Sequence, residues 1–184
     1  TCVFRSPLIK TGVTEFVSWI NSMRAAAIAD GEWTPEQQAA WLPGIASGDT
    51  VPCICITEPE HGTDAAAMQA KAIRTEDGWT LHGEKTSITL GMAADRAVVL
   101  ARTGGPGARG VSAFWVDLQH PTVTRSAFDD LGSRAIGRAS LHFDGTPVGR
   151  NDLIGAEGEG FKIAMHSLDQ GRFTVAAGAV GVVR

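Results

Sequence analysis

The chain has 184 residues and a formal net charge of −4, with hydrophobic and charged shares of 43% and 20%. This length suits one domain of ordinary size with its own core, and the composition is that of a globular protein. The acidic balance argues against a nucleic-acid partner, because phosphate binding needs clustered Lys and Arg. The nearest approach to a basic cluster is a set of separated arginines, which we interpret as surface charges: Arg125, Arg134, Arg138 and Arg150.

Membrane and metal sites are also disfavoured. The longest apolar stretch, residues 175–183, is too short to cross a bilayer, and no signal peptide is apparent. The three cysteines, Cys2, Cys53 and Cys55, lack the C-x₂-C spacing of zinc sites, and the five histidines show no ligand spacing. We therefore expect reduced, buried thiols in a cytoplasmic protein without a metal. The C-x-C pair would place both thiols on one face of a strand.

The first third of the chain predicts helices. Apolar residues recur at helical spacing over residues 16–27. A second helix is expected after Thr34, which is a good N-cap, with Gln37 completing a capping box. Pro43 and Gly48 are expected to end that helix.

Short strands are predicted after residue 51. Residues 52–57 form an apolar, β-branched run, and residues 68–74 alternate between apolar and polar side chains. Asp77-Gly78 predicts a hairpin turn before a return strand at residues 79–82. Further strands are expected at residues 96–102, 111–117, 123–127 and 140–144. Short strands at this spacing favour an antiparallel barrel or sandwich.

A last helix is predicted near the C-terminus. Phe161, Ala164, Met165 and Leu168 recur at helical spacing after a glycine-rich segment. This helix is expected to continue to the end of the chain without a cap, which indicates a fragment of a longer protein. The fold class predicted from the sequence is therefore α+β, with an antiparallel β-barrel or sandwich between helical segments.

Three polar segments are candidates for a ligand site. Residues 57–64, T-E-P-E-H-G-T-D, follow a buried strand and could offer N–H groups and hydroxyls to an anionic or carbonyl-rich ligand. Residues 83–91 carry alternating hydroxyls that could line a cofactor. Asp169 and Arg172 share a helix face. Each segment also has an ordinary structural interpretation: a solvated loop, a strand with one polar side and a surface ion pair.

Taken in order, several short motifs resemble those of the acyl-CoA dehydrogenase family. They are Leu42-Pro43, Ala46-Ser47-Gly48, Thr57-Glu58-Pro59, Gly62-Thr63-Asp64, Gly83-Glu84-Lys85-Thr86, Ile88-Thr89, Leu131-Gly132 with Arg134, Gly155 with Glu157-Gly158, Gly160-Phe161-Lys162, and Asp169 with Arg172. The resemblance spans residues 34–184. It implies that residues 1–50 end an N-terminal helical domain, residues 51–155 form a flavin-binding middle β domain, and residues 156–184 begin a C-terminal helical bundle.

The resemblance implies that FAD is bound. The implied cofactor-binding residues come from two polar segments and the strand before the first: Ile54, Ile56, Thr57, Gly62, Thr63, Ser87, Ile88 and Thr89. The Thr89 hydroxyl would approach flavin N5, whereas Ser87 replaces a tryptophan that is usual in the family. The implied substrate-binding residues are Thr63, Asp169 and Arg172.

The implied reaction is the FAD-dependent α,β-dehydrogenation of an acyl-CoA thioester in fatty acid metabolism, with an electron-transferring flavoprotein as acceptor. The base in this family is a Glu, which would lie beyond Arg184 or at the position of Gly171, and glycine cannot accept a proton. We therefore expect no catalytic residue in this chain and an inactive isolated chain. The complete protein is expected to be a homo-oligomer or to have a partner subunit. The alternatives are a flavin-dependent monooxygenase or oxidase of the same superfamily, and a non-catalytic β-domain module.

Overall fold

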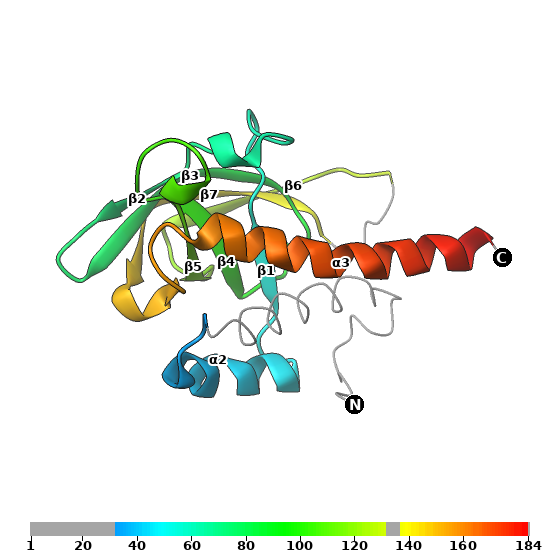
Figure 1. Cartoon of the computed structure of the whole chain (residues 1–184), viewed down its shortest axis with the longest axis horizontal. Helices are drawn as coiled ribbons and strands as arrows, with labels where there is room; N and C mark the ends of the chain where they lie inside the picture. Colours follow the sequence, from blue (N-terminus) through cyan, green and yellow to red (C-terminus); the bar gives the residue numbers. More distant parts are fainter. Residues whose placement is uncertain (1–31, 132–136, 184) are drawn as a thin grey trace.

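The computed structural model describes residues 32–131 and 137–183 (Figure 1). Its elements in chain order are α2 (Pro35–Ser47), β1 (Pro52–Cys55), η2 (Ala65–Ala67), β2 (Lys71–Arg74), β3 (Gly78–Ile88), β4 (Arg96–Arg102), η3 (Ala108–Gly110), β5 (Val111–Asp117), β6 (Val123–Ala127), β7 (Ala139–Gly149), η5 (Arg150–Asp152), β8 (Leu153–Ile154) and α3 (Gly160–Val183). The helix predicted over residues 16–27 lies outside the described residues, as do Cys2, Gly132 and Arg134.

Helix α2 begins as the sequence predicts. Thr34 Oγ1 accepts a hydrogen bond from the Gln37 N–H at 3.2 Å, and Gln37 Oε1 accepts one from the Thr34 N–H at 3.0 Å. Gly48, at a φ of 83°, ends the helix. Pro43 does not end it, contrary to prediction, and the helix continues for about one more turn. A proline removes one intrahelical hydrogen bond, but the turn after it carries Ile45, which is buried against the sheet.

Within the described residues, the strands form one mixed sheet of eight strands. Their order is β6-β7-β3-β2-β4-β5-β8, and β1 pairs with β4. β1 and β2 run parallel to β4, and the sheet is open. The α+β class is confirmed, but the antiparallel barrel or sandwich is wrong in strand direction and in closure. That prediction was based on the alternation of apolar and polar residues. Alternation indicates on which face of the sheet a side chain lies, but it does not indicate which strands pair or in which direction.

The sheet has a hydrophobic core on each face. Alternation along β1 sends Cys53 and Cys55 into the first core and Ile54 into the second. Both thiols are free and buried, as predicted. A hydrogen bond with Cys55, together with burial, raises the pKa of Cys53 well above 9.0, so its thiol stays protonated and unreactive.

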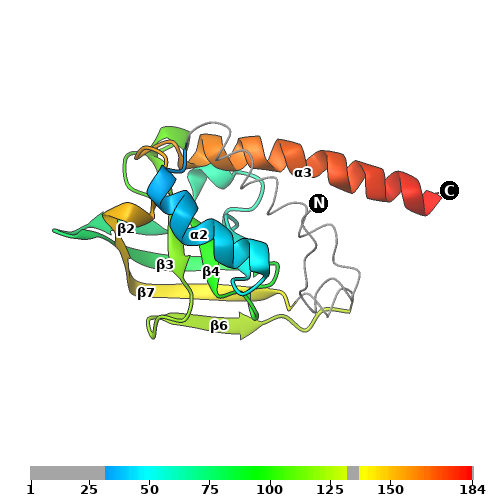
Figure 2. The same cartoon turned by 90° about the horizontal axis from the view of Figure 1, so that it is seen from below.

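The second core lies between the sheet and the two helices. It includes Trp115 of β5 and Ile163 and Ala164 of α3. The helices α2 and α3 lie near the part of the sheet that β1, β4 and β5 form (Figure 1, Figure 2). The C-terminal half of α3 extends beyond the sheet. In the described part of the chain, no helix is both long and apolar enough to span a membrane.

Candidate functional site

A pocket of about 330 Å³ lies where the end of β1, the loop after it, the end of β3 and helix α3 meet. All eight residues predicted from the sequence to bind the cofactor line this pocket. The remaining lining residues are Ala65, Phe161, Met165, Leu168 and Arg172. Tertiary structure therefore brings together the segments that the sequence singled out separately, while the role of each residue stays a prediction.

The apolar lining comes from β1 and α3. Ile54 belongs to the second core, and Ile56 is packed against it. Phe161, Met165 and Leu168 are spaced by four and three residues, so they share one face of α3. In the sequence these three residues indicated only a helix. Their position beside a β domain becomes apparent only when α3 packs against the sheet.

The hydroxyl lining comes from an irregular end of β3. The β3–β7 register shifts just before Ile88, and Ser87 has a φ of 59°. Such left-handed backbone is uncommon outside glycine. It lets the consecutive residues 87–89 all reach the pocket, where a regular strand would send alternate side chains to opposite faces. The Thr86 N–H donates to the Thr57 carbonyl at 2.9 Å, which ties this segment to the end of β1.

A buried ion pair lies behind the pocket lining. Lys85 Nζ donates to Glu58 Oε1 at 2.8 Å and to the Ile56 carbonyl at 3.0 Å. The side chains of Lys85 and Glu58 are 0% and 6% exposed. The Glu58 carboxylate also accepts hydrogen bonds from the N–H groups of Gln69 at 2.6 Å and Ala70 at 2.9 Å. The pair is thus hydrogen-bonded as well as charge-matched, which buried charges require.

Glu58 and Lys85 belong to the family motifs, but the sequence predicted no role for either. The available signal was Lys85 in the segment 83–91, for which a strand was the ordinary structural interpretation, since lysine is rarely buried without a partner. Burial lowers the pKa of Lys85, and the Glu58 carboxylate opposes that effect. Burial alone would raise the pKa of Glu58, but the Lys85 charge and the N–H groups of Gln69 and Ala70 together hold it below the ordinary 4.5. Glu58 is therefore ionised at neutral pH.

We expect the fold to lose stability as the pH falls below about 4.5. Folded Glu58 binds a proton less readily than unfolded Glu58, so the unfolded state takes up more protons in this range and the free energy of unfolding decreases. Urea unfolding between about pH 6 and pH 3.5 measures the effect, with Glu58→Gln/Lys85→Met as the control. Because the control lacks the pair, its unfolding midpoint should decrease less; equal decreases would contradict the prediction.

Arg172 and Asp169 form an ion pair on α3, as their spacing predicts, and their side chains are 75% and 63% exposed. Arg172 lines the pocket, whereas Asp169 is not among its lining residues. Gly171 lies in the same helix, three residues after Leu168. Among the residues that the structure describes, no group of three His, Cys, Asp or Glu side chains could hold a metal ion.

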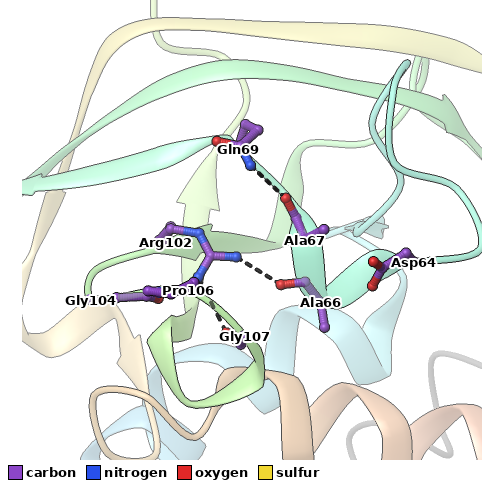
Figure 3. Close-up of a pocket in the computed structure, with 9 residues that line it drawn as sticks. Asp64, Ala66, Ala67, Gln69, Arg102, Gly104, Pro106 and Gly107 are labelled. Atoms are coloured by element: carbon purple, nitrogen blue, oxygen red, sulfur yellow. Dashed lines mark hydrogen bonds between the residues drawn. The ribbon is translucent and has the colours of Figure 1, made fainter.

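A second pocket, of about 510 Å³, lies between η2 and the loop before η3 (Figure 3). Asp64, Gln69 and the residue 104–107 loop line it, together with Arg102. Each nitrogen of the Arg102 guanidinium donates to backbone carbonyls, those of Ala66, Met68, Gly105 and Gly107. Arg102 therefore ties η2 to the loop before η3 and does not present an uncommitted guanidinium to a ligand.

A family model described as "Acyl-CoA dehydrogenase, middle domain" matches residues 53–146, which is just over half of the chain. The human mitochondrial short-chain specific acyl-CoA dehydrogenase is 38% identical over 151 residues, covering 81% of this chain and 37% of that protein. The solved butyryl-CoA dehydrogenase of Megasphaera elsdenii has a TM-score of 0.81 at 36% identity, covering 88% of this chain and 43% of that one.

A solved structure described as the electron transferring flavoprotein of Acidaminococcus fermentans has a TM-score of 0.77 at 42% identity, covering 81% of this chain and 40% of that one. This chain thus spans less than half the length of each of these relatives. A solved structure described as PigA with FAD and proline has a TM-score of 0.76 at 26% identity, covering 79% of this chain and 38% of that one. On the match over residues 53–146 and these likenesses, the chain belongs to the acyl-CoA dehydrogenase family.

Proposed function

We propose that the 330 Å³ pocket binds the flavin of FAD, and that the protein takes part in the α,β-dehydrogenation of an acyl-CoA thioester. One observation supports this function above the others. Eight residues from separate segments, which the family resemblance associates with the cofactor, line one pocket. The division of the chain at residues 50 and 155 into helical, flavin-binding and helical parts belongs to the same proposal.

The residues present fit a flavin. A flavin ring system has flat apolar faces and a polar edge, so it needs apolar surface and a few hydrogen-bonding groups. Ile54 of β1 and Ile56, just after this strand, supply apolar surface, and the face of α3 supplies more. The hydroxyls of Thr57, Ser87 and Thr89 supply the polar groups. The pocket volume is also within the range of about 300–1,000 Å³ that small-ligand sites occupy.

In this proposal FAD supplies the hydride-accepting chemistry, and the chain supplies binding, orientation and exclusion of water. The apolar lining keeps water from the reacting part of the substrate. The Thr57 and Thr89 hydroxyls orient the cofactor, while Thr63 lies at the position proposed for the thioester. Arg172 contributes positive charge from α3, and its contact with Asp169 restrains its side chain.

The proton acceptor is proposed to come from another part of the complete protein or from a partner subunit. None of the described residues that line the pocket carries a carboxylate, and the position associated with a base in part of the family is Gly171. We further propose an electron-transferring flavoprotein as acceptor and a homo-oligomeric complete protein. The human relative is mitochondrial by name, so the cytoplasmic location expected from the cysteines stays a prediction.

Titration of the purified chain with FAD tests the proposal. Bound flavin should show a visible band that is shifted and better resolved than that of free FAD, and bound FAD should be retained on gel filtration. The matched variant Ile56→Asp places a carboxylate in the apolar lining and should abolish retention. A folded wild-type chain that retains no FAD would overturn the proposed function and favour a non-catalytic β-domain module. Rapid reoxidation of the reduced flavin by oxygen would favour the oxidase or monooxygenase alternative.

We predict that the isolated wild-type chain oxidises no acyl-CoA, and that Gly171→Glu introduces weak activity. Residue 171 is three positions from Leu168 and so lies on a neighbouring part of the helix surface that lines the pocket. A carboxylate there could accept the α proton. The measurement is reduction of an artificial electron acceptor by FAD-loaded protein in the presence of butyryl-CoA. Gly171→Gln, which has the same size without the charge, is the control. Turnover by the wild type or by the Gln variant would contradict the assignment.

A further inference from the structure

The buried Lys85 ammonium bonds to the chain on both sides of Thr57. One N–H group donates to the carbonyl of Ile56 at 3.0 Å, and another donates to the carboxylate of Glu58 at 2.8 Å. The residue between these two partners is Thr57, which lines the pocket. A single cation therefore fixes the residues before and after a proposed flavin contact.

The surrounding hydrogen bonds leave this segment little freedom. The Thr57 carbonyl accepts from the Thr86 N–H at 2.9 Å. Glu58 and His61 exchange two backbone hydrogen bonds of 3.2 Å, and the Glu58 carboxylate holds the N–H groups of Gln69 and Ala70. Lys85 and Thr86 immediately precede the hydroxyl lining at residues 87–89. The ion pair thus connects the β1 side of the pocket to the β3 side.

We propose that Lys85 and Glu58 are positioning residues that fix the backbone and hydroxyl of Thr57 and thereby set the affinity of the pocket for flavin. This inference rests on the proposed function, because it assumes that the pocket binds FAD. Neither side chain is among the residues that line the pocket, so both act through Thr57 and the 87–89 segment.

A purely structural role would not need an ion pair at this place. Apolar side chains of similar volume often replace a buried ion pair with no loss of stability. They cannot bond to the Ile56 carbonyl or to the two N–H groups, so they would leave Thr57 less restrained. A binding site that must order itself when the ligand arrives has lower affinity than one that is ordered beforehand.

The variant Glu58→Gln/Lys85→Met separates positioning from folding. The Gln carbonyl can still accept from Gln69 or Ala70, and no uncompensated charge remains, but the Lys85 contact with the Ile56 carbonyl is gone. We expect FAD affinity to decrease by about tenfold or more while the chain stays folded. In the flavin-free protein, we expect hydrogen exchange to accelerate in the segment 56–58 and to stay unchanged in β5.

Met68→Leu is the matched control. Met68 is buried and its sulfur accepts a hydrogen bond from Lys85 Nζ at 3.6 Å, but the variant keeps the bonds from Lys85 to the Ile56 carbonyl and to the Glu58 carboxylate. This control should keep wild-type FAD affinity and wild-type exchange at residues 56–58. If the double variant does not fold, Glu58→Gln tests the Glu58 contact alone, because it weakens the bond to residue 58 and keeps the bond from Lys85 to the Ile56 carbonyl. FAD affinity should then decrease by a smaller factor, and unchanged affinity overturns the inference.

The outcomes separate the two proposals. The positioning role is supported if the double variant binds FAD more weakly and exchanges faster at residues 56–58, and if Met68→Leu shows neither effect. Equal FAD affinity in the folded double variant and the wild type, or unchanged exchange at residues 56–58, overturns the inference and leaves the proposed function standing. A wild-type chain that binds no FAD overturns the proposed function, and this inference with it.

Discussion

The Lys85→Met variant is expected to lose about 3–5 kcal/mol of unfolding free energy, the largest single effect we predict. Methionine is close to lysine in length and fits the buried space, so the loss comes from charge and not from a cavity. Without the ammonium, the Glu58 carboxylate is left buried beside an apolar side chain with only its two backbone N–H partners. Equilibrium urea unfolding followed by circular dichroism measures the change.

Two comparisons isolate the cause. Lys71→Met makes the same exchange at an exposed position in β2, and should alter stability by no more than about 0.5 kcal/mol. The double variant Glu58→Gln/Lys85→Met should recover much of the loss, because it leaves no uncompensated charge. If Lys85→Met is as stable as the wild type, or no less stable than the double variant, an unpaired Glu58 carboxylate does not destabilise the fold.

The Gly160→Ala variant is expected to weaken FAD binding by about tenfold or more and to destabilise the fold by about 1–3 kcal/mol. Gly160 begins α3, and a Cβ placed there would overlap the Ser112 carbonyl carbon and the Ala113 amide nitrogen of β5. Backbone atoms of a strand that is hydrogen-bonded on both sides, to β4 and β8, cannot give way as a flexible side chain would. The start of α3 must therefore move away from the sheet, and the α3 residues that line the pocket move with it.

FAD titration and urea unfolding together measure this prediction. Gly105→Ala is the control, since a Cβ at Gly105 meets no atom within 4 Å, and it should leave affinity and stability close to wild type. Tight FAD binding by Gly160→Ala would show that the α3 lining contributes little to the site. A decrease in stability with unchanged affinity would place the effect in the second core alone.

The sequence by itself determined the elements whose signals are local. The capping box of Thr34 and Gln37 is a four-residue pattern, and it holds in the structure. The strands predicted at residues 96–102, 111–117 and 123–127 have the observed bounds, because alternation and turn residues are visible within a few positions. The motif order also indicated the family and eight cofactor candidates, all of which line the pocket.

Tertiary structure decided what local patterns cannot encode. β1 pairs directly with β4 in parallel, although the β2–β3 hairpin separates them along the chain. The alternation of side chains is the same for parallel and antiparallel strands, so it could not predict this pairing. The Lys85–Glu58 pair joins residues 27 positions apart. The sequence around either residue does not indicate which residue will be its partner. The α3 lining of the pocket exists because Gly160 lets the helix approach β5. Whether a segment forms a helix or a strand is thus decided largely by neighbouring residues. Strand direction, charge pairing and the assembled pocket depend on close packing between distant parts of the chain.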